Sequence, residues 1–258
     1  MINRREFCLS LGAALLPSAR RAASQSTSAF LERTYQNPRG ASMPYRLFVP
    51  RGYDERRAYP LVLWLHGGRG PRSDRDKPIS EGNRIGSHVW TSVGNQSRNP
   101  CFVLAPQCPP NEVWADIETA KPTKHLQVAY ELLQEIQQNY RVDAQRLYVV
   151  GQSMGGFGTW SLISEHPHVF AAAIPVCGGG DKAQASKLTD MPVWAFHGER
   201  DEAVSVVRSR EMIAAIRRAG GSPKYTEYQG MGHVIWDKVF SEPGLLSWVF
   251  AQNRGDRR

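Results

Sequence analysis

The sequence predicts a single doubly wound α/β domain, with a mostly parallel sheet, helices on both faces and no large cap domain. Short runs that are apolar throughout alternate along the chain with segments of helical period, which is typical of a parallel sheet covered on both sides. The chain has 258 residues, of which 41% are hydrophobic, so it is long enough for one sizeable core. It carries no internal repeat and no linker, and the 178–191 connection is too short for a cap domain.

The first predicted strands differ in polarity. Residues 30–35 and 44–49 mix polar and apolar side chains, which favours an antiparallel edge. Residues 61–65 and 102–105 are apolar, which favours strands buried on both faces. The 67–100 stretch is rich in glycine, proline, asparagine and charge, and it predicts a long irregular loop. A loop of this length in a compact domain is usually functional, and we expect it to line a site together with residues 109–120.

The second half of the chain continues the alternation. Apolar residues at three- and four-residue steps predict a helix within 119–140. Ser205 is the expected N-cap of a later helix. The other predicted elements are strands at 147–150, 172–176, 193–196 and 225–228, and helices at 154–165, 205–219 and 244–251.

Residues 1–24 resemble a twin-arginine export signal. Arg4 and Arg5 precede an apolar run, 7–16, that is too short to span a bilayer. The alternative is the basic start of an amphipathic helix, and the cleavage position is left open between the small residues near 19 and 24. We therefore expect a periplasmic or secreted protein with a mature domain over 25–252 and a disordered basic tail over 253–258.

The net charge of +8 would suit a nucleic-acid partner if it were concentrated on the folded domain. Four arginines and one glutamate lie in the first 24 residues, so the rest of the chain carries +5, part of it on the terminal arginines. No basic stripe with interleaved aromatic residues occurs in the body of the chain. We therefore expect no nucleic-acid partner and no stable membrane span, and the sequence does not predict an oligomeric state.

The cysteines predict no disulfide framework. Cys8 lies in the predicted signal, and Cys101 and Cys108 flank one strand whose length holds them too far apart to bridge. Cys177 follows another strand and could meet one of them, so a pairing stays open. No zinc-type spacing and no glycine-rich phosphate loop is present, so the sequence predicts neither a metal nor a cofactor.

A candidate nucleophile lies in the run Gly151-Gln152-Ser153-Met154-Gly155. This G-x-S-x-G pattern follows a predicted strand and precedes a predicted helix, which is the context that a nucleophile elbow requires. The tight turn crowds the backbone around the serine, so small residues are needed on both sides. We expect Ser153 to project at the carboxyl end of the sheet.

A serine nucleophile needs a base, and the base needs an orienting carboxylate. Asp201 and His233 follow two later predicted strands in the order acid, then histidine, and both lie where an open α/β sheet forms its site. Glu199 and Glu202 are rivals for the acid. Asp237 is a weaker rival because it lies beyond the histidine.

The turn His66-Gly67-Gly68 ends the 61–65 strand and suits an oxyanion hole. We assign the two donors to the N–H groups of Met154 and Gly68, with Arg69 as the rival for the second. His66 and His197 are expected to hold loops by hydrogen bonds. Trp114 and Trp236 lie near the predicted site and are the candidate substrate contacts, although packing is the commoner role of a tryptophan.

These motifs together resemble the α/β-hydrolase esterases. Leu65-His66-Gly67-Gly68, the run 151–156, His197-Gly198 with Asp201, and Gly232-His233 occur in the order seen in that superfamily. The chain is most similar to its compact, lidless branch: phospholipase/carboxylesterases, dienelactone hydrolase-like proteins, feruloyl and polyhydroxybutyrate esterases, and predicted peptidases. The resemblance covers residues 44–252 and implies a Ser-His-Asp triad that cleaves small-molecule or oligomeric carboxylic esters through an acyl-enzyme.

Two departures narrow the resemblance. Ser153 stands where dienelactone hydrolases proper use cysteine, and no propeller domain precedes the catalytic region as it does in prolyl oligopeptidases. Two alternatives stay open at this point: a serine peptidase or amidase on the same triad, and a non-catalytic binding protein on the same scaffold.

Overall fold

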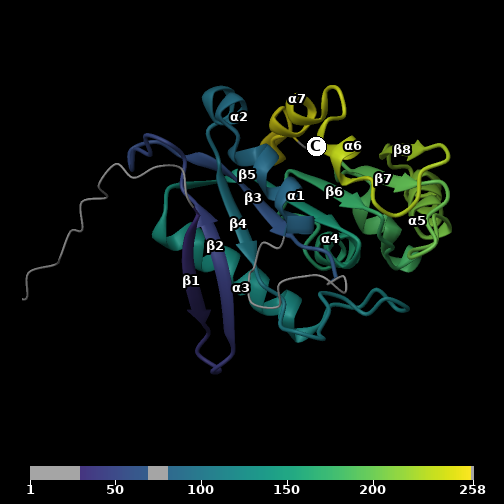
Figure 1. Cartoon of the computed structure of the whole chain (residues 1–258), viewed down its shortest axis with the longest axis horizontal. Coiled ribbons are helices and arrows are strands. Elements are labelled where there is room, and N and C mark those ends of the chain that lie inside the picture. The colour runs from purple at the N-terminus through teal and green to yellow at the C-terminus, as the bar shows by residue number, and fades with distance from the viewer. Residues whose placement is uncertain (1–29, 69–80, 257–258) are drawn as a thin grey trace, which may run out of the picture.

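The computed structural model describes residues 30–68 and 81–256, and the predicted export signal lies outside them. The described residues contain an eight-stranded sheet in the order β1-β2-β4-β3-β5-β6-β7-β8 (Figure 1). The strands are β1 Leu31–Gln36, β2 Ser42–Phe48, β3 Tyr59–Leu65, β4 Phe102–Pro106, β5 Val142–Gln152, β6 Ala172–Val176, β7 Trp194–Gly198 and β8 Lys224–Tyr228. β1 and β2 are antiparallel, β2 pairs antiparallel with β4, and the other pairings are parallel. The predicted α/β class and antiparallel edge are therefore confirmed.

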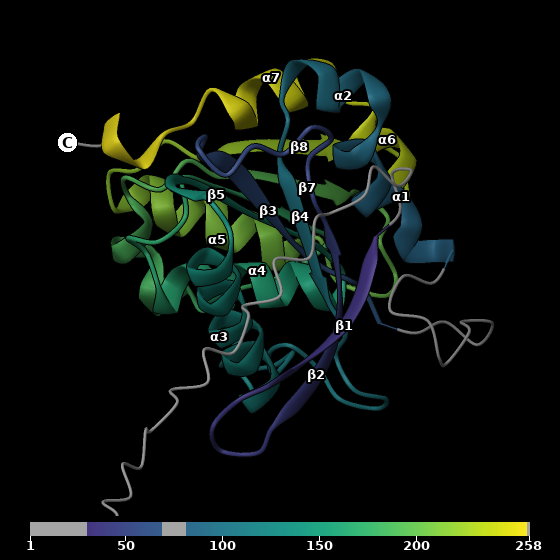
Figure 2. The ribbon, with the colours of Figure 1, turned by 90° about the vertical axis from the view of Figure 1, so that its left-hand side faces the viewer.

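Helices cover both faces of this sheet. They are α1 Glu81–Thr91, α2 Val93–Arg98, α3 Lys124–Asn139, α4 Met154–Glu165, α5 Val207–Arg218, α6 Trp236–Phe240 and α7 Leu245–Phe250, with 3-10 turns η1 Lys182–Leu188 and η2 Arg254–Asp256. Figure 2 shows α3, α4 and α5 below the strands and α6 and α7 above them. None of the helices in the described ranges is long and apolar enough to cross a membrane.

Strand β3 shows why the strands are apolar throughout. Its residues alternate between the two layers: Leu61 and Leu63 pack with α3, α4 and α5, whereas Val62 and Trp64 pack with α1, α6 and α7. Both faces of β3 are fully buried. A strand between two helical layers has no polar face, and the continuous apolar run at 61–65 follows from this position.

The prediction of one irregular loop over 67–100 is wrong for its second part, where α1 and α2 lie. Gly86 is one reason that the helical pattern is hidden: a Cβ at this position would lie 1.9 Å from the ring of Trp64. Helix α1 packs so closely on β3 that only glycine fits there. Glycine lowers helix propensity by about 1 kcal/mol relative to alanine. The local sequence therefore does not predict α1, which forms because it packs against the sheet.

The structure differs from the sequence-based expectations in three smaller respects. Val206, not Ser205, is the N-cap of α5, although the Ser205 hydroxyl accepts from the N–H of Val207 at 3.4 Å. The predicted disordered tail is ordered at η2, because the Arg254 guanidinium donates to the carbonyl of His168 at 2.6 Å and to Gln145 at 3.1 Å. Finally, η1 and α6 are too short to show a helical period and were not expected.

Candidate active site

Ser153 occupies a strained turn between β5 and α4. Its φ is +53° and its ψ is −117°, a conformation that L side chains rarely adopt. Its N–H donates to the carbonyl of Val176 on β6 at 2.8 Å, and its carbonyl accepts from Phe157 at 3.1 Å. The turn is thus fixed by the neighbouring strand and by the helix that it starts. The predicted elbow between a strand and a helix is present.

Gly155 lets the elbow sit against the sheet. A Cβ on this residue would lie 1.9 Å from the carbonyl oxygen of Leu65, at the end of β3. Helix α4 therefore begins in direct backbone contact with the turn that carries His66 and Gly67. The second glycine of the G-x-S-x-G motif is required by this contact.

His233 lies in the loop after β8, within hydrogen-bond reach of both other candidates. Its Nε2 is 2.9 Å from Ser153 Oγ, and its Nδ1 is 2.6 Å from Asp201 Oδ2. Because Nδ1 faces a carboxylate it carries the proton, so Nε2 accepts from the serine hydroxyl. This is the arrangement in which an imidazole can remove the proton of a serine nucleophile. The structure brings together the three residues chosen from the sequence.

Asp201 is buried at the end of β7, and its side chain is fully inaccessible. Burial by itself raises the pKa of this carboxyl, but the N–H of Val204 at 2.8 Å, the His233 ring and the N–H of Ala203 at 2.9 Å outweigh it. The pKa of Asp201 therefore lies below its ordinary value, and the carboxylate is ionised beside His233.

The other candidates for the triad carboxylate do not bond to His233. Glu199 accepts from the N–H of Gly230 at 2.7 Å, which ties the loop after β7 to the loop after β8. Glu202 and Asp237 are exposed. The only carboxylate that bonds to His233 among the described residues is that of Asp201.

The glycine turn after β3 is held by His66. The N–H of Cys108 donates to His66 Nε2 at 3.0 Å, so Nδ1 carries the proton and donates to the carbonyl of Gly67 at 2.7 Å. This fits the loop-holding role that the sequence predicts for His66. Met154 begins α4, where the helix leaves backbone N–H groups unpaired by its own turns. Gly68 is exposed at the described end of the turn, and its rival Arg69 lies outside the described residues.

The two candidate substrate contacts have different surroundings. Trp114 is wholly buried, and its indole N–H donates to the carbonyl of His66 at 3.0 Å. The prediction that it contacts substrate is therefore wrong for this structure, because the ring has no accessible surface and packs behind the glycine turn. Trp236 packs edge-on against the His233 ring at 5.3 Å and is 9% exposed. A substrate contact by Trp236 stays a prediction.

Sequence reasoning missed the position of Cys177 beside the acid and base. Its φ of +47° is unusual for cysteine, and its thiol donates to the carbonyl of His233 at 3.6 Å. Burial, with the nearby charge of Asp201, raises the pKa of this thiol far above its ordinary value. No local pattern signals this contact, since it depends on how β6 and the histidine loop meet.

Cys177, Asp201 and His233 are also the one group within the described ranges whose ligand atoms lie close enough for a metal, all within 4.8 Å of one another. Their chemistry does not suit an ion, because His233 and Asp201 already bond to each other and the thiol is protonated. The described cysteines, 101, 108 and 177, are buried and form no disulfide with one another.

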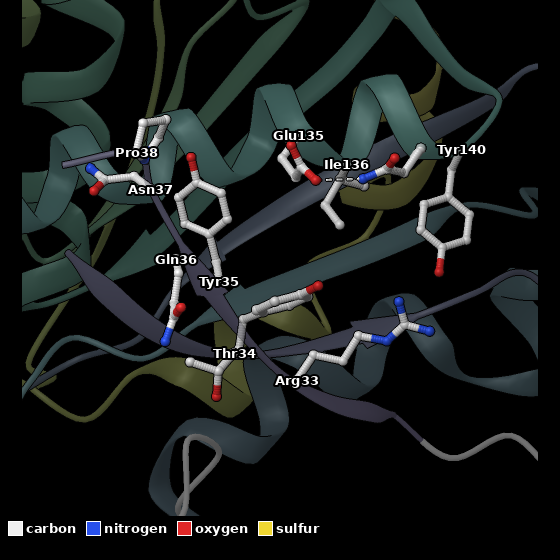
Figure 3. A pocket seen from close by; sticks show the side chains of 11 residues that line it. Arg33, Thr34, Tyr35, Gln36, Asn37, Pro38, Glu135, Ile136 and Tyr140 are labelled. Atoms are coloured by element: carbon white, nitrogen blue, oxygen red, sulfur yellow. Dashed lines mark hydrogen bonds between the residues drawn. The ribbon is translucent and has the colours of Figure 1, made fainter. Parts of the chain in front are cut away.

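A separate polar pocket of about 610 Å³ lies between β1 and α3 (Figure 3). It is lined by residues 33–38 of β1 and the turn after it, by Tyr45 of β2, and by Glu135, Ile136, Asn139 and Tyr140 at the end of α3. None of the three triad candidates lines it. It is therefore distinct from the candidate active site.

Several known proteins are similar to this chain in sequence or in fold. The bifunctional acetylxylan esterase/xylanase XynS20E of Neocallimastix patriciarum is 26% identical over 172 residues, covering 66% of this chain and 23% of that protein. Poly(3-hydroxyalkanoate) depolymerase C of Paucimonas lemoignei is 36% identical over 134 residues, covering 49% of this chain and 30% of that protein. The chain thus spans less than a third of the length of either relative.

Among solved structures, a thermostable esterase is 40% identical, with a TM-score of 0.81 over 87% of this chain and 63% of that one. The agreement supports the α/β-hydrolase fold assigned from the sheet order and the elbow. The family model Esterase, described as "Putative esterase", matches residues 37–236, which include all three triad candidates. The chain belongs to this esterase family.

Proposed function

We propose that this chain is a carboxylic ester hydrolase that works through Ser153, His233 and Asp201. The observation that carries the proposal is the hydrogen-bond chain from Ser153 Oγ to His233 (2.9 Å) and from His233 to Asp201 (2.6 Å). Membership of the esterase family, and the chain's similarity to an acetylxylan esterase and a poly(3-hydroxyalkanoate) depolymerase, support ester rather than amide substrates.

In the proposed reaction, His233 Nε2 takes the proton of Ser153 Oγ as that oxygen attacks the ester carbonyl. The N–H groups of Met154 and Gly68 donate to the tetrahedral oxyanion, and Asp201 stabilises the imidazolium. The intermediate collapses, the alcohol leaves with the proton from His233, and an acyl-enzyme remains on Ser153. Water then attacks the acyl carbon as His233 accepts its proton. The bond between the acyl carbon and Ser153 Oγ breaks, Oγ takes that proton back from His233, and the acid is released.

The test uses three substitutions and a fluorophosphonate probe. Ser153→Ala removes the nucleophile, so we expect loss of probe labelling and a fall in kcat on the order of 10⁶ with a short aryl ester. Asp201→Asn holds His233 in the wrong tautomer, so we expect a fall of about 10⁴. Asp237→Asn is the matched control and keeps wild-type rates. Wild-type turnover by purified Ser153→Ala would refute the proposal.

The substrate class is tested by pairing leaving groups. Ester and amide derivatives of one acyl group separate an esterase from a peptidase or amidase, and we expect turnover of the ester alone. Acetylated xylan and a poly(3-hydroxyalkanoate), the polymers in the relatives' names, are then compared with small aryl esters. Failure of the fluorophosphonate probe to label Ser153 would favour a binding protein.

Export belongs to the same proposal. We propose that residues 1–24 direct twin-arginine export and that residues 25–252 form one domain. The apolar run of ten residues behind Arg4 and Arg5 supports this assignment. Replacing both arginines by lysine in a bacterium with this pathway is expected to leave the activity in the cytoplasm, whereas the unchanged signal moves it to the periplasm or medium. Equal export of both forms would contradict it.

A further inference from the structure

A second imidazole contacts the carboxylate of the triad. His197 lies on β7 and is fully buried, and its Nε2 is 3.2 Å from Asp201 Oδ2 and 2.9 Å from the carbonyl oxygen of Val204. Its Nδ1 is 2.7 Å from the hydroxyl of Ser209 on α5, which is in turn 3.0 Å from the carbonyl of Gly178. Both ring nitrogens are therefore held.

These partners define the proton positions. Nε2 faces two acceptors, a carbonyl and a carboxylate, so it carries a proton and donates. The Ser209 hydroxyl donates to the carbonyl of Gly178, so its oxygen lies against Nδ1 and fixes that side of the ring. Burial lowers the pKa of His197, against the opposing effects of the Val204 carbonyl and the Asp201 charge. The ring cannot turn without losing bonds on both sides.

The contact adds a further polar neighbour to the carboxylate of Asp201. Oδ1 accepts the N–H groups of Ala203 and Val204, while Oδ2 accepts from His233 at 2.6 Å and faces the His197 N–H at 3.2 Å. Oδ2 is the oxygen that the catalytic base uses. The His197 N–H therefore takes up part of the negative charge that would otherwise act on His233 alone.

We propose that His197 is a positioning residue, which holds Asp201 Oδ2 in place and sets how strongly that oxygen binds the proton on His233. The proposal rests on the proposed function of the triad. His197 has no exposed surface and does not touch substrate, so it acts through Asp201. The ionisable groups that act on His197 are Asp201, His233 and Glu227.

The experiment compares His197→Phe, which keeps a planar ring without an N–H, with His197→Gln, whose amide places a donor near the position of Nε2. His166→Phe is the matched control: His166 is a half-buried histidine stacked on Tyr130 at 3.8 Å, outside the triad. Rates are taken per site labelled by the fluorophosphonate probe, and kcat/KM is followed against pH.

In His197→Phe we expect kcat to fall about 10- to 100-fold, the effect of losing one hydrogen bond to a charged group. KM stays within about twofold, because substrate is not contacted. The acidic limb of the kcat/KM profile moves to higher pH, since a carboxylate with one donor fewer holds the proton on His233 more strongly. His197→Gln restores both kcat and the pH position of the acidic limb, and His166→Phe changes neither.

A folded His197→Phe with unchanged kcat and acidic limb would overturn the proposal. So would a loss of rate without a shift of the limb and without rescue by glutamine, which would show a purely structural role. If His197→Phe does not fold, Ser209→Ala decides: it keeps the imidazole but removes the Nδ1 partner. A smaller shift of the limb in the same direction supports the proposal, and a wild-type profile overturns it. Ser153→Ala distinguishes a failure of this proposal from a failure of the proposed function. Wild-type turnover in that variant would refute the triad on which the role of His197 rests.

Discussion

At the scale of single residues, the carboxyl of Asp201 combines two opposing effects. Its side chain is inaccessible to water, which penalises the charge, yet backbone and imidazole N–H groups surround it and stabilise the charge by more. The result is an ionised carboxylate inside the protein. An ionised carboxylate is what His233 needs to keep its proton on Nδ1.

The lowered pKa of Asp201 predicts how stability changes with pH. A carboxyl with a native pKa below its unfolded value of about 3.9 contributes stability that is complete above that value. The contribution disappears as the pH falls through the native pKa, because the unfolded chain binds the proton first. We expect the difference in unfolding free energy between wild type and Asp201→Asn to be constant near neutral pH and to shrink below about pH 3.9.

Urea unfolding between pH 3 and pH 6 measures this difference. Asp190→Asn is a suitable comparison because Asp190 is exposed, and its difference from wild type should stay flat. A difference between wild type and Asp201→Asn that grows on acidification would show that Asp201 binds its proton more readily in the folded protein, contrary to the bonds seen around it.

At the scale of elements, the site depends on how closely α4 approaches β3. The backbone of Gly155 leaves no room for a Cβ against the carbonyl of Leu65. The same helix start carries the Ser153 turn and the predicted Met154 donor. Packing of this one helix therefore positions two of the groups that the proposed reaction uses.

Gly155→Ala tests this dependence. We expect the free energy of unfolding to fall by about 1–3 kcal/mol, because the added methyl overlaps backbone that cannot give way. Catalysis should fall as well, since the serine turn moves with α4. Gly94 is exposed on helix α2, and a Cβ there would lie 3.8 Å from its nearest neighbour, the Arg98 guanidinium. Gly94→Ala should therefore be neutral or stabilising by up to about 1 kcal/mol. Equal stability of the two variants, measured by urea unfolding, would contradict the argument.

The elements also show what the sequence can and cannot predict. The central strands were predictable because burial on two faces demands apolar runs, and the triad because its motifs follow those strands in a known order. Helix α1 was not, since packing against Trp64 demands a glycine that lowers its helix propensity. The contact of Cys177 with His233 and that of His197 with Asp201 arise only where β6, β7 and the histidine loop meet, so no local pattern shows them.

At the scale of the whole molecule, the described part of the fold contains no covalent cross-link. Cys101, Cys108 and Cys177 are buried and form no disulfide with one another, and burial raises the pKa of Cys101 to about 12. A protonated and inaccessible thiol does not react as a nucleophile. Stability therefore depends on the two apolar layers around the sheet.

This predicts that a reductant leaves the Tm unchanged. In a Cys8→Ser variant, we expect no thiol to react with a disulfide reagent within minutes under native conditions, and three to react after unfolding in urea. A control with Cys101→Ser should release one thiol fewer. A drop in Tm on reduction, or rapid native labelling, would contradict the burial of these side chains.

The position of β8 determines whether activity or the folded core is lost first when the protein is heated or treated with denaturant. This strand is one of the two edge strands of the sheet, pairs only with β7, and is less buried than the end of β5 that leads to Ser153. His233 follows this strand, whereas the nucleophile is anchored at the centre. An outer strand opens at lower free energy than the core. The chain should therefore lose its base, and its activity, by fraying at β8 while the central strands of the sheet are still folded.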